Sequence, residues 1–212
     1  MSIICVINVP DGIVMSADCR CTINDGEKFN DEYEKLFLLE FNGHTVGISS
    51  CGDANLDGKN YAQYFQDVIQ QLKPSYNFLN VAQILQIKLL LRSLNQETYH
   101  YVCGYENSRP VIYLVSKFKY DILNDYGIEY KGATETAQCL IDNMYGKMDY
   151  SSMRLEEAIE IARVIITLTI ACQHVEEKED QYRTCGGNAK FVVLTKDNSC
   201  SWFEDTTPMA SF

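Results

Sequence analysis

The sequence predicts an α+β protein with a four-layer α/β/β/α sandwich, in which two antiparallel sheets pack together and helices cover both outer faces. Two observations carry this prediction. Segments with helical periodicity come in consecutive pairs between groups of strand-like segments, so strands and helices do not alternate as in a doubly wound parallel sheet. Several strand-like segments are joined by short turns typical of hairpins, which indicates antiparallel pairing. With one helix pair on the outer face of each sheet, the apolar stripe of every predicted helix is buried against a sheet.

Length and composition indicate one domain. The chain has 212 residues, of which 46% are hydrophobic, and this is enough for a substantial core. Its 4 prolines and 12 glycines are scattered, and the sequence shows neither an internal repeat nor a flexible linker. We therefore expect a single domain over residues 1–212.

The beginning of the chain is predicted to form two hairpins. The strands are residues 3–7, 13–17, 35–40 and 45–50. They are rich in β-branched and other apolar residues, and residues 10–12 between the first two include Pro and Gly, which favour a turn. Asn42 and Gly43 separate the second pair, and this dipeptide is the strongest short hairpin signal.

Helical periodicity replaces strand alternation after residue 60. One apolar stripe recurs at steps of three and four residues and comprises Tyr61, Tyr64, Phe65, Val68, Ile69 and Leu72. This helix ends before Pro74, because the residue preceding a proline disfavours helical geometry. Asn77 or Asn80 can cap the next helix. The core-facing residues of that helix are Val81, Ile84, Leu85, Leu91 and Leu94.

The second half repeats the order of strands, helices and strands. Its strands are residues 99–105, 111–116, 190–195 and 200–204. After a polar stretch, Gly132 opens a first helical segment. Ser151 and Ser152 can cap a longer helix over residues 154–172, whose first turn contains acidic residues that favour the helix dipole.

The cysteines and histidines give no sign of a metal site. The nine cysteines form no CxxC pair, and His44, His100 and His174 lie far apart, so we expect reduced thiols, no structural metal and no cofactor. No hydrophobic leader precedes the first strand. The longest uncharged apolar run, residues 164–172, is too short to span a bilayer. We expect a cytoplasmic protein that does not enter a membrane.

The formal net charge of −11 argues against partners rich in phosphate. Binding to nucleic acid or to an anionic membrane requires clustered Lys and Arg, which neutralise phosphate groups. The acidic cluster at residues 176–180 is interpreted as a solvated helix end or loop. We therefore expect neither nucleic acid nor a membrane as partner.

Five segments carry a resemblance to a known family. They are residues 11–20 (DGIVMSADCR), 35–37 (KLF), 46–53 (VGISSCGD), 103–113 (CGYENSRPVIY) and 186–187 (GG). In this order they resemble the proteasome β-subunit family and its bacterial ring-peptidase relatives, which are N-terminal-nucleophile (Ntn) hydrolases. No helical extension precedes the first strand, so the likeness is to catalytic-type β subunits. The resemblance implies the same sandwich.

The resemblance also implies a peptidase that acts on peptide or unfolded-protein substrates. It further implies a homo-oligomeric ring and, as a possible partner, an ATPase unfoldase. Such an enzyme uses the hydroxyl of its first residue as nucleophile and its own α-amine, with a pKa near ~8, as base. Ser2 would be the nucleophile after removal of Met1, which a small second residue permits. Asp18 and Lys35 match the family's buried Asp and its Lys, which lowers the proton affinity of the nucleophile.

Several positions depart from the family pattern. The nucleophile is Ser rather than Thr, and the glycine whose N–H binds the oxyanion falls at Ser49 or Ser50, where a backbone donor survives. Lys131 stands where the family has a supporting Ser. In the final motif, Tyr182 replaces an Asp and Cys185 replaces a Ser. Cys185 can still donate a weak hydrogen bond, whereas Tyr182 cannot supply a carboxylate.

The sequence leaves more than one hypothesis open. In the first, the chain is an Ntn peptidase, or a relative that cuts another amide, with Ser2 as nucleophile. In the second, Met1 is retained and the chain is a catalytically inactive subunit with a structural, assembly or ligand-binding role. A third possibility is that Cys5 is a hidden nucleophile, which requires cleavage inside a core strand. Removal of Met1 distinguishes the first two hypotheses.

Overall fold

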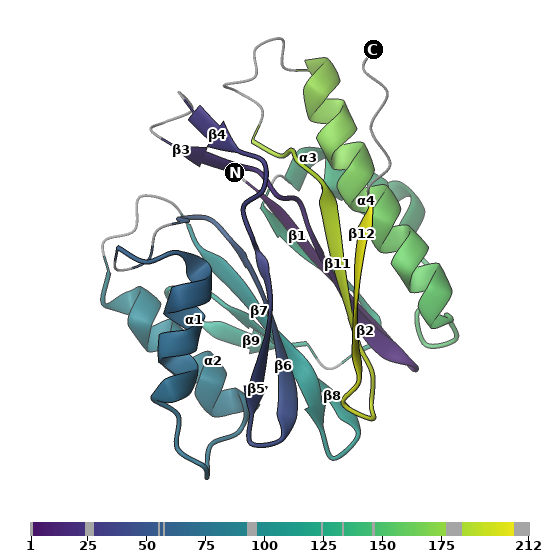
Figure 1. The fold of residues 1–212 in the computed structure, drawn as a ribbon. Coiled ribbons are helices and arrows are strands. Elements are labelled where there is room, and N and C mark those ends of the chain that lie inside the picture. Colours follow the sequence, from purple (N-terminus) through teal and green to yellow (C-terminus); the bar gives the residue numbers. More distant parts are fainter. Residues whose placement is uncertain are drawn as a thin grey trace.

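The computed structural model describes residues 2–23, 28–54, 56, 58–92, 97–123, 125–132, 134–145, 147–176 and 184–205. Two antiparallel sheets of five strands each lie face to face, and helices cover the outside of both (Figure 1). The predicted α/β/β/α sandwich, an α+β fold, is confirmed.

The first sheet has the strand order β10-β1-β2-β11-β12. Its strands are β1 (Ile3–Val9), β2 (Gly12–Ala17), β10 (Gly127–Gly132), β11 (Ala189–Leu194) and β12 (Cys200–Asp205). All neighbouring pairs are antiparallel. Because β1 lies between β10 and β2, its backbone is held on both sides. Residues 3–9 are therefore fixed within the sheet.

The second sheet has the order β5-β6-β7-β8-β9. Its strands are β5 (Leu36–Phe41), β6 (His44–Cys51), β7 (Tyr99–Glu106), β8 (Arg109–Val115) and β9 (Tyr120–Ile122). At the β5–β6 turn, Asn42 and Gly43 both have positive φ, of 51° and 77°, as a tight two-residue hairpin requires. A separate hairpin of β3 (Cys21–Ile23) and β4 (Lys28–Asn30) projects beyond the sandwich.

One pair of helical segments covers each sheet. Helices α1 (Tyr61–Gln70) and α2 (Phe78–Leu90) pack on the second sheet. Helix α3 (Thr134–Leu140), the π-helical turn Ile141–Tyr145 and α4 (Leu155–Glu176) lie over the first sheet. Within the described ranges, no helix combines the length and the apolarity that crossing a membrane would need.

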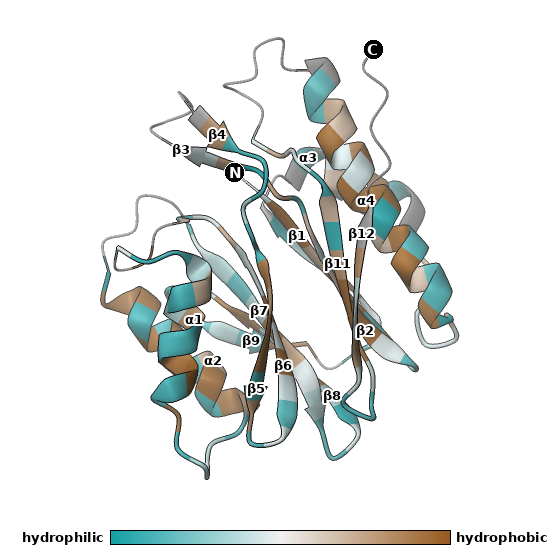
Figure 2. Cartoon of the chain, viewed as in Figure 1, coloured by the Kyte–Doolittle hydropathy of each residue, from teal (hydrophilic) through white to brown (hydrophobic). Residues whose placement is uncertain are grey.

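Apolar residues fill three layers between these elements. On β1, Ile3, Cys5 and Ile7 pack on the side of α4, whereas Ile4 and Val6 pack between the sheets. The strand is therefore apolar on both faces instead of alternating, and Figure 2 shows β1 in brown over most of its length. The stripes of α1 and α2 form the third layer with the second sheet.

The helix caps agree only in part with those predicted. Asn77 caps α2, and it exchanges hydrogen bonds with Asn80 in a capping box. The predicted cap of α4 is wrong. The hydroxyls of Ser151 and Ser152 donate to the Asp149 carboxylate at 2.5 and 2.9 Å, in a turn that precedes the helix.

Four strands were not predicted, namely β3, β4, β9 and β10. Of these, β10 matters most, because it pairs with β1 beside Ser2. It lies at the edge of the sheet and is only partly buried, so polar residues such as Glu129 and Lys131 are tolerated in it. The alternation of Ile128 and Tyr130 was the available signal.

Candidate active site

Asp18 lies at the centre of a cluster of hydrogen-bond donors. Its side chain follows directly after β2 and is 0% exposed. Oδ1 accepts from the Lys35 ammonium at 2.6 Å and from the Ile3 N–H at 3.0 Å. Oδ2 accepts from the N–H groups of Arg20 and Gly186, each at 3.1 Å. These hydrogen bonds replace the ones that the carboxylate would make with water if it were exposed.

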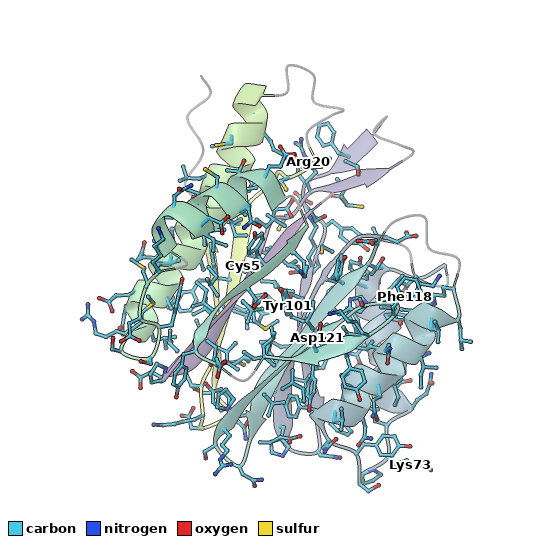
Figure 3. All side chains as sticks on the ribbon, turned by 180° about the vertical axis from the view of Figure 1, so that it is seen from behind. Cys5, Arg20, Lys73, Tyr101, Phe118 and Asp121 are labelled. Carbon is cyan, nitrogen blue, oxygen red and sulfur yellow. The ribbon has the colours of Figure 1, made fainter. Side chains whose placement is uncertain are left out.

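The groups around Asp18 come from segments far apart in the sequence. Pairing in the β1–β2 hairpin brings Ile3 beside Asp18. Lys35 directly precedes β5, so its ion pair with Asp18 bridges the two sheets. Gly186 belongs to the segment before β11. The cluster therefore joins the sheets at the end where β3 and β4 project and where Arg20 is labelled in Figure 3.

Ser2 is the first described residue and is 8% exposed. Its peptide bond to Ile3 supplies the N–H that Asp18 accepts, so the backbone of Ser2 is tied to the cluster. Even-numbered residues of β1 face the second sheet. Ser2 directly precedes β1, and the same alternation directs its side chain into the layer between the sheets. The structure thus brings Ser2, Asp18 and Lys35 to one place.

Gly132 packs directly against Ser2. It pairs with Ile3 across β1 and β10, and its φ of 108° is rare for residues with a side chain. A Cβ atom at this position would lie 1.6 Å from the Ser2 carbonyl oxygen. This close approach therefore requires glycine.

The substitution Gly132→Ala is expected to displace Ser2 and to lower the free energy of unfolding by about 2 kcal/mol or more, because a strained φ alone costs about 1–3 kcal/mol. Gly127→Ala is a matched control on the same strand, since nothing lies within 4 Å of its added Cβ. Urea denaturation of both variants measures the difference. Equal stability of the two variants would contradict the close contact.

A second ion pair supports the cluster from the side of β4. Arg20 Nε and Nη2 donate to the two Asp31 carboxylate oxygens at 2.6 and 2.7 Å. The guanidinium carbon lies 4.1 Å from the centroid of the Phe29 ring. A Cβ at Gly186 would lie 2.4 Å from Arg20 Nε, so this glycine packs closely on the pair. Arg20 ends the segment 11–20 that carries the family resemblance, but sequence reasoning gave no role to Arg20 or to Asp31.

Ser49 and Ser50 lie next to Lys35 at the end of β6, and their side chains point to opposite faces of the sheet. The Ser50 N–H donates to the Lys35 carbonyl at 3.0 Å, and its hydroxyl lies 2.8 Å from His100 Nδ1. Burial, with a smaller contribution from Arg92, lowers the pKa of His100 to about 3, so the neutral imidazole can accept from Ser50. The Ser49 hydroxyl is buried without a partner in the described part of the chain.

Cys185 packs on the other face of the first sheet, in the layer under α4. Its N–H donates to Gln173 Oε1 at 2.8 Å. Burial, followed by the negative charge of Asp18, raises the pKa of the Cys185 thiol well above its ordinary value, so the thiol is neutral. The neighbouring Gly186 supplies the N–H that reaches Asp18.

The remaining positions of the family pattern add little to the cluster. The Lys131 ammonium lies 5.6 Å from the centroid of the Tyr99 ring. Met1 and Tyr182 lie outside the described residues. In the part of the chain that the structure describes, no group of three or more His, Cys, Asp or Glu side chains is placed to hold a metal ion.

The environment of Cys5 contradicts the hypothesis of a hidden nucleophile. Cys5 is 0% exposed in the middle of β1, which pairs with a strand on each side. Burial raises the pKa of its thiol to about 12, far from the values of reactive cysteines. Cleavage after Ile4 would also remove part of a central strand.

Labelling of the native protein with a maleimide at neutral pH is expected to modify Cys139 and Cys200 first, because both are exposed. Cys5 should stay unmodified until the protein unfolds, since only the thiolate reacts readily. Peptide mapping by mass spectrometry after short reaction times measures this order. Early modification of Cys5 would contradict its burial.

Comparison with known proteins identifies the fold. The sequence matches no protein-family profile and no curated protein. A Gly-1 mutant of Anbu from Hyphomicrobium sp. strain MC1 superposes with a TM-score of 0.71 at 16% identity, over 97% of this chain and 86% of that chain. Anbu from Yersinia bercovieri, described as an ancestral β-subunit, has a TM-score of 0.71 at 11% identity, over 97% and 89%. The chain therefore has the fold of a proteasome-like, Ntn-type subunit.

Proposed function

We propose that the chain is a proteasome-type Ntn peptidase in which Ser2 is the nucleophile once Met1 has been removed. The observation that carries this proposal is the buried Asp18 carboxylate, which joins the Lys35 ammonium to the backbone of Ser2. Burying two charges is costly, and a buried pair is weak evidence of stabilisation. In the proposal the Lys35 ammonium acts on the Ser2 hydroxyl, and a nearby positive charge favours the deprotonated nucleophile. The proteasome-like fold supports the same assignment.

In this proposal the free α-amine of Ser2 accepts the hydroxyl proton as Oγ attacks the carbonyl carbon of a peptide bond. The tetrahedral intermediate collapses to an ester of Ser2, and the protonated α-amine passes its proton to the leaving amine. Water, activated by the same α-amine, then hydrolyses the ester and restores Ser2. A base with a pKa of about 8 suits this exchange at neutral pH.

The surrounding residues have separate roles in the proposal. Asp18 positions the Lys35 ammonium, and that ammonium lowers the proton affinity of Ser2 Oγ. The oxyanion requires a hydrogen-bond donor, and the end of β6 lies next to Lys35. Because the Ser50 N–H is donated to Lys35, we assign the oxyanion contact to Ser49, whose hydroxyl has no partner in the described part of the chain. Ser50 and Cys185 then hold the surrounding backbone.

The proposal includes peptides or unfolded proteins as substrates, a homo-oligomeric ring and an ATPase unfoldase as a possible partner. These elements rest on the family resemblance and the fold. The competing proposal is a catalytically inactive subunit that keeps Met1 and serves in assembly or ligand binding. The departures at Lys131 and Tyr182 favour this alternative, because Lys131 cannot supply the hydroxyl of the family pattern and Tyr182 cannot supply its carboxylate.

A comparison of two chains tests the proposal. One begins at Ser2, released from a removable N-terminal fusion, and the other carries one additional residue before Ser2. We expect the first chain to hydrolyse members of a pooled peptide library and the second to be inactive, because its Ser2 lacks a free amine. Light scattering under the same conditions reports assembly. An assembled Ser2-start chain without turnover would reject the peptidase and favour the inactive subunit.

A further inference from the structure

A cavity lies between the two sheets, at the end of β1 opposite Ser2. Its volume is about 210 Å³. Val6, Ile112 and Leu123 provide apolar walls, and Asn8, Tyr126 and Glu129 provide polar ones. The cavity therefore combines an apolar chamber with a few polar groups, as small-molecule sites do.

Asn8 is the buried polar group of this cavity. Its side chain is 3% exposed, and its Nδ2 donates to the Asp125 carbonyl at 3.2 Å. Its Oδ1 is buried without a partner in the described residues. A buried acceptor without a donor is unfavourable and rare in native proteins. Asn8 Oδ1 therefore lacks the donor that a buried acceptor normally has, on a residue that lines the cavity.

Glu129 places a carboxylate at the mouth of the same cavity. It pairs with Val6 across β1 and β10, so its side chain lies on the same face as those of Val6 and Asn8. Diagonal neighbours in an antiparallel pair are about 7–8 Å apart, so one small group between Asn8 and Glu129 can contact both. Glu129 is exposed on β10, and its partial burial raises the pKa of its carboxyl; Lys131 opposes this rise and Asp121 adds to it. A positive charge would complement these groups.

We infer that this cavity binds a small primary alkylammonium compound. The ammonium group lies between Asn8 Oδ1 and the Glu129 carboxylate and donates to both. Its alkyl chain packs on Val6, Ile112 and Leu123, and Tyr126 closes one side. A cation with three N–H donors matches an unpaired acceptor and a carboxylate, and the apolar walls favour an organic cation over a metal ion. This site is independent of the cluster around Asp18.

The experiment uses the full chain and n-butylammonium as probe. Calorimetric titration is compared with n-butanol, which has a similar shape without the charge, and with butyrate, which carries the opposite charge. Glu129→Gln removes the Glu129 carboxylate from the cavity lining, which also includes Asp125. Glu135→Gln is the matched control, because Glu135 is exposed like Glu129 but lies on α3 and does not line the cavity. Ser2→Ala reports whether the probe binds at the candidate active site instead.

We expect one n-butylammonium per chain, with affinity at least about tenfold above that of n-butanol and no binding of butyrate. Glu129→Gln should weaken binding about tenfold or more, whereas Glu135→Gln and Ser2→Ala should leave it unchanged. Equal affinity for n-butanol, or no effect of Glu129→Gln, would overturn the inference. Loss of binding in Ser2→Ala would place the probe at the other end of the sandwich and overturn it as well.

Discussion

Ser2→Ala is expected to lower kcat/KM for peptide hydrolysis by about 10⁴-fold or more, because it removes the atom that forms the covalent intermediate. The variant should fold normally, since it loses only one hydroxyl at a site where the backbone makes the hydrogen bond to Asp18. Turnover of fluorogenic peptides by the chain that begins at residue 2 measures the effect. Circular dichroism and thermal unfolding verify the fold.

Ser2→Thr is the matched control for this prediction. It keeps the hydroxyl and the free amine, so activity should remain well above that of Ser2→Ala. A loss in both variants would indicate that any change at Ser2 disturbs the site. Normal turnover by Ser2→Ala would remove Ser2 from the mechanism.

Lys35→Met is expected to abolish hydrolysis and also to destabilise the fold by about 3–5 kcal/mol, because it leaves the buried Asp18 carboxylate without its cation. The Lys35 and Asp18 side chains are only 2% and 0% exposed. Lys119→Met is the matched control. Lys119 pairs with Asp121 at the surface, where the two side chains are 69% and 41% exposed. Removing such an exposed pair costs less than about 1 kcal/mol.

Urea denaturation of the two lysine variants measures the difference in the free energy of unfolding. The double variant Lys35→Met with Asp18→Asn should be more stable than Lys35→Met alone, because it no longer buries an unpaired charge. It should remain inactive. If Lys35→Met were as stable as Lys119→Met, the buried ion pair would not hold the two sheets together as described.

The layered fold could be predicted because apolar periodicity marks most of its elements. The paired stripes of α1 and α2 and the hairpin turn at Asn42 and Gly43 are local signals, and both are present in the structure. The prediction that Leu91 faces the core is wrong, because α2 ends at Leu90 and Leu91 is 80% exposed. The edge strand β10 was missed because half of its positions carry polar residues. The cap of α4 was wrong because Ser151 and Ser152 bind a nearby carboxylate instead of the helix backbone.

The residues of the candidate site could not be identified from local sequence patterns alone. Asp18 and Lys35 were found from a family resemblance, since Lys35 by itself reads as an ordinary residue of a surface strand. Its near-complete burial follows from the packing of one sheet on the other, which sequence does not reveal. The N–H of Ser50 is donated to Lys35 because of the β5–β6 register, and a register cannot be deduced from residue types at the strand end.

The intact mass of the protein purified from cells, with fragmentation of its N-terminus, tests the central claim most directly. The proposed peptidase requires that the chain begin at Ser2, with its amine and hydroxyl on the same residue. The account predicts a mass lacking Met1 and a first fragment that starts at Ser2. A protein that retains Met1 throughout would have a blocked Ser2, and this result would contradict the proposed nucleophile.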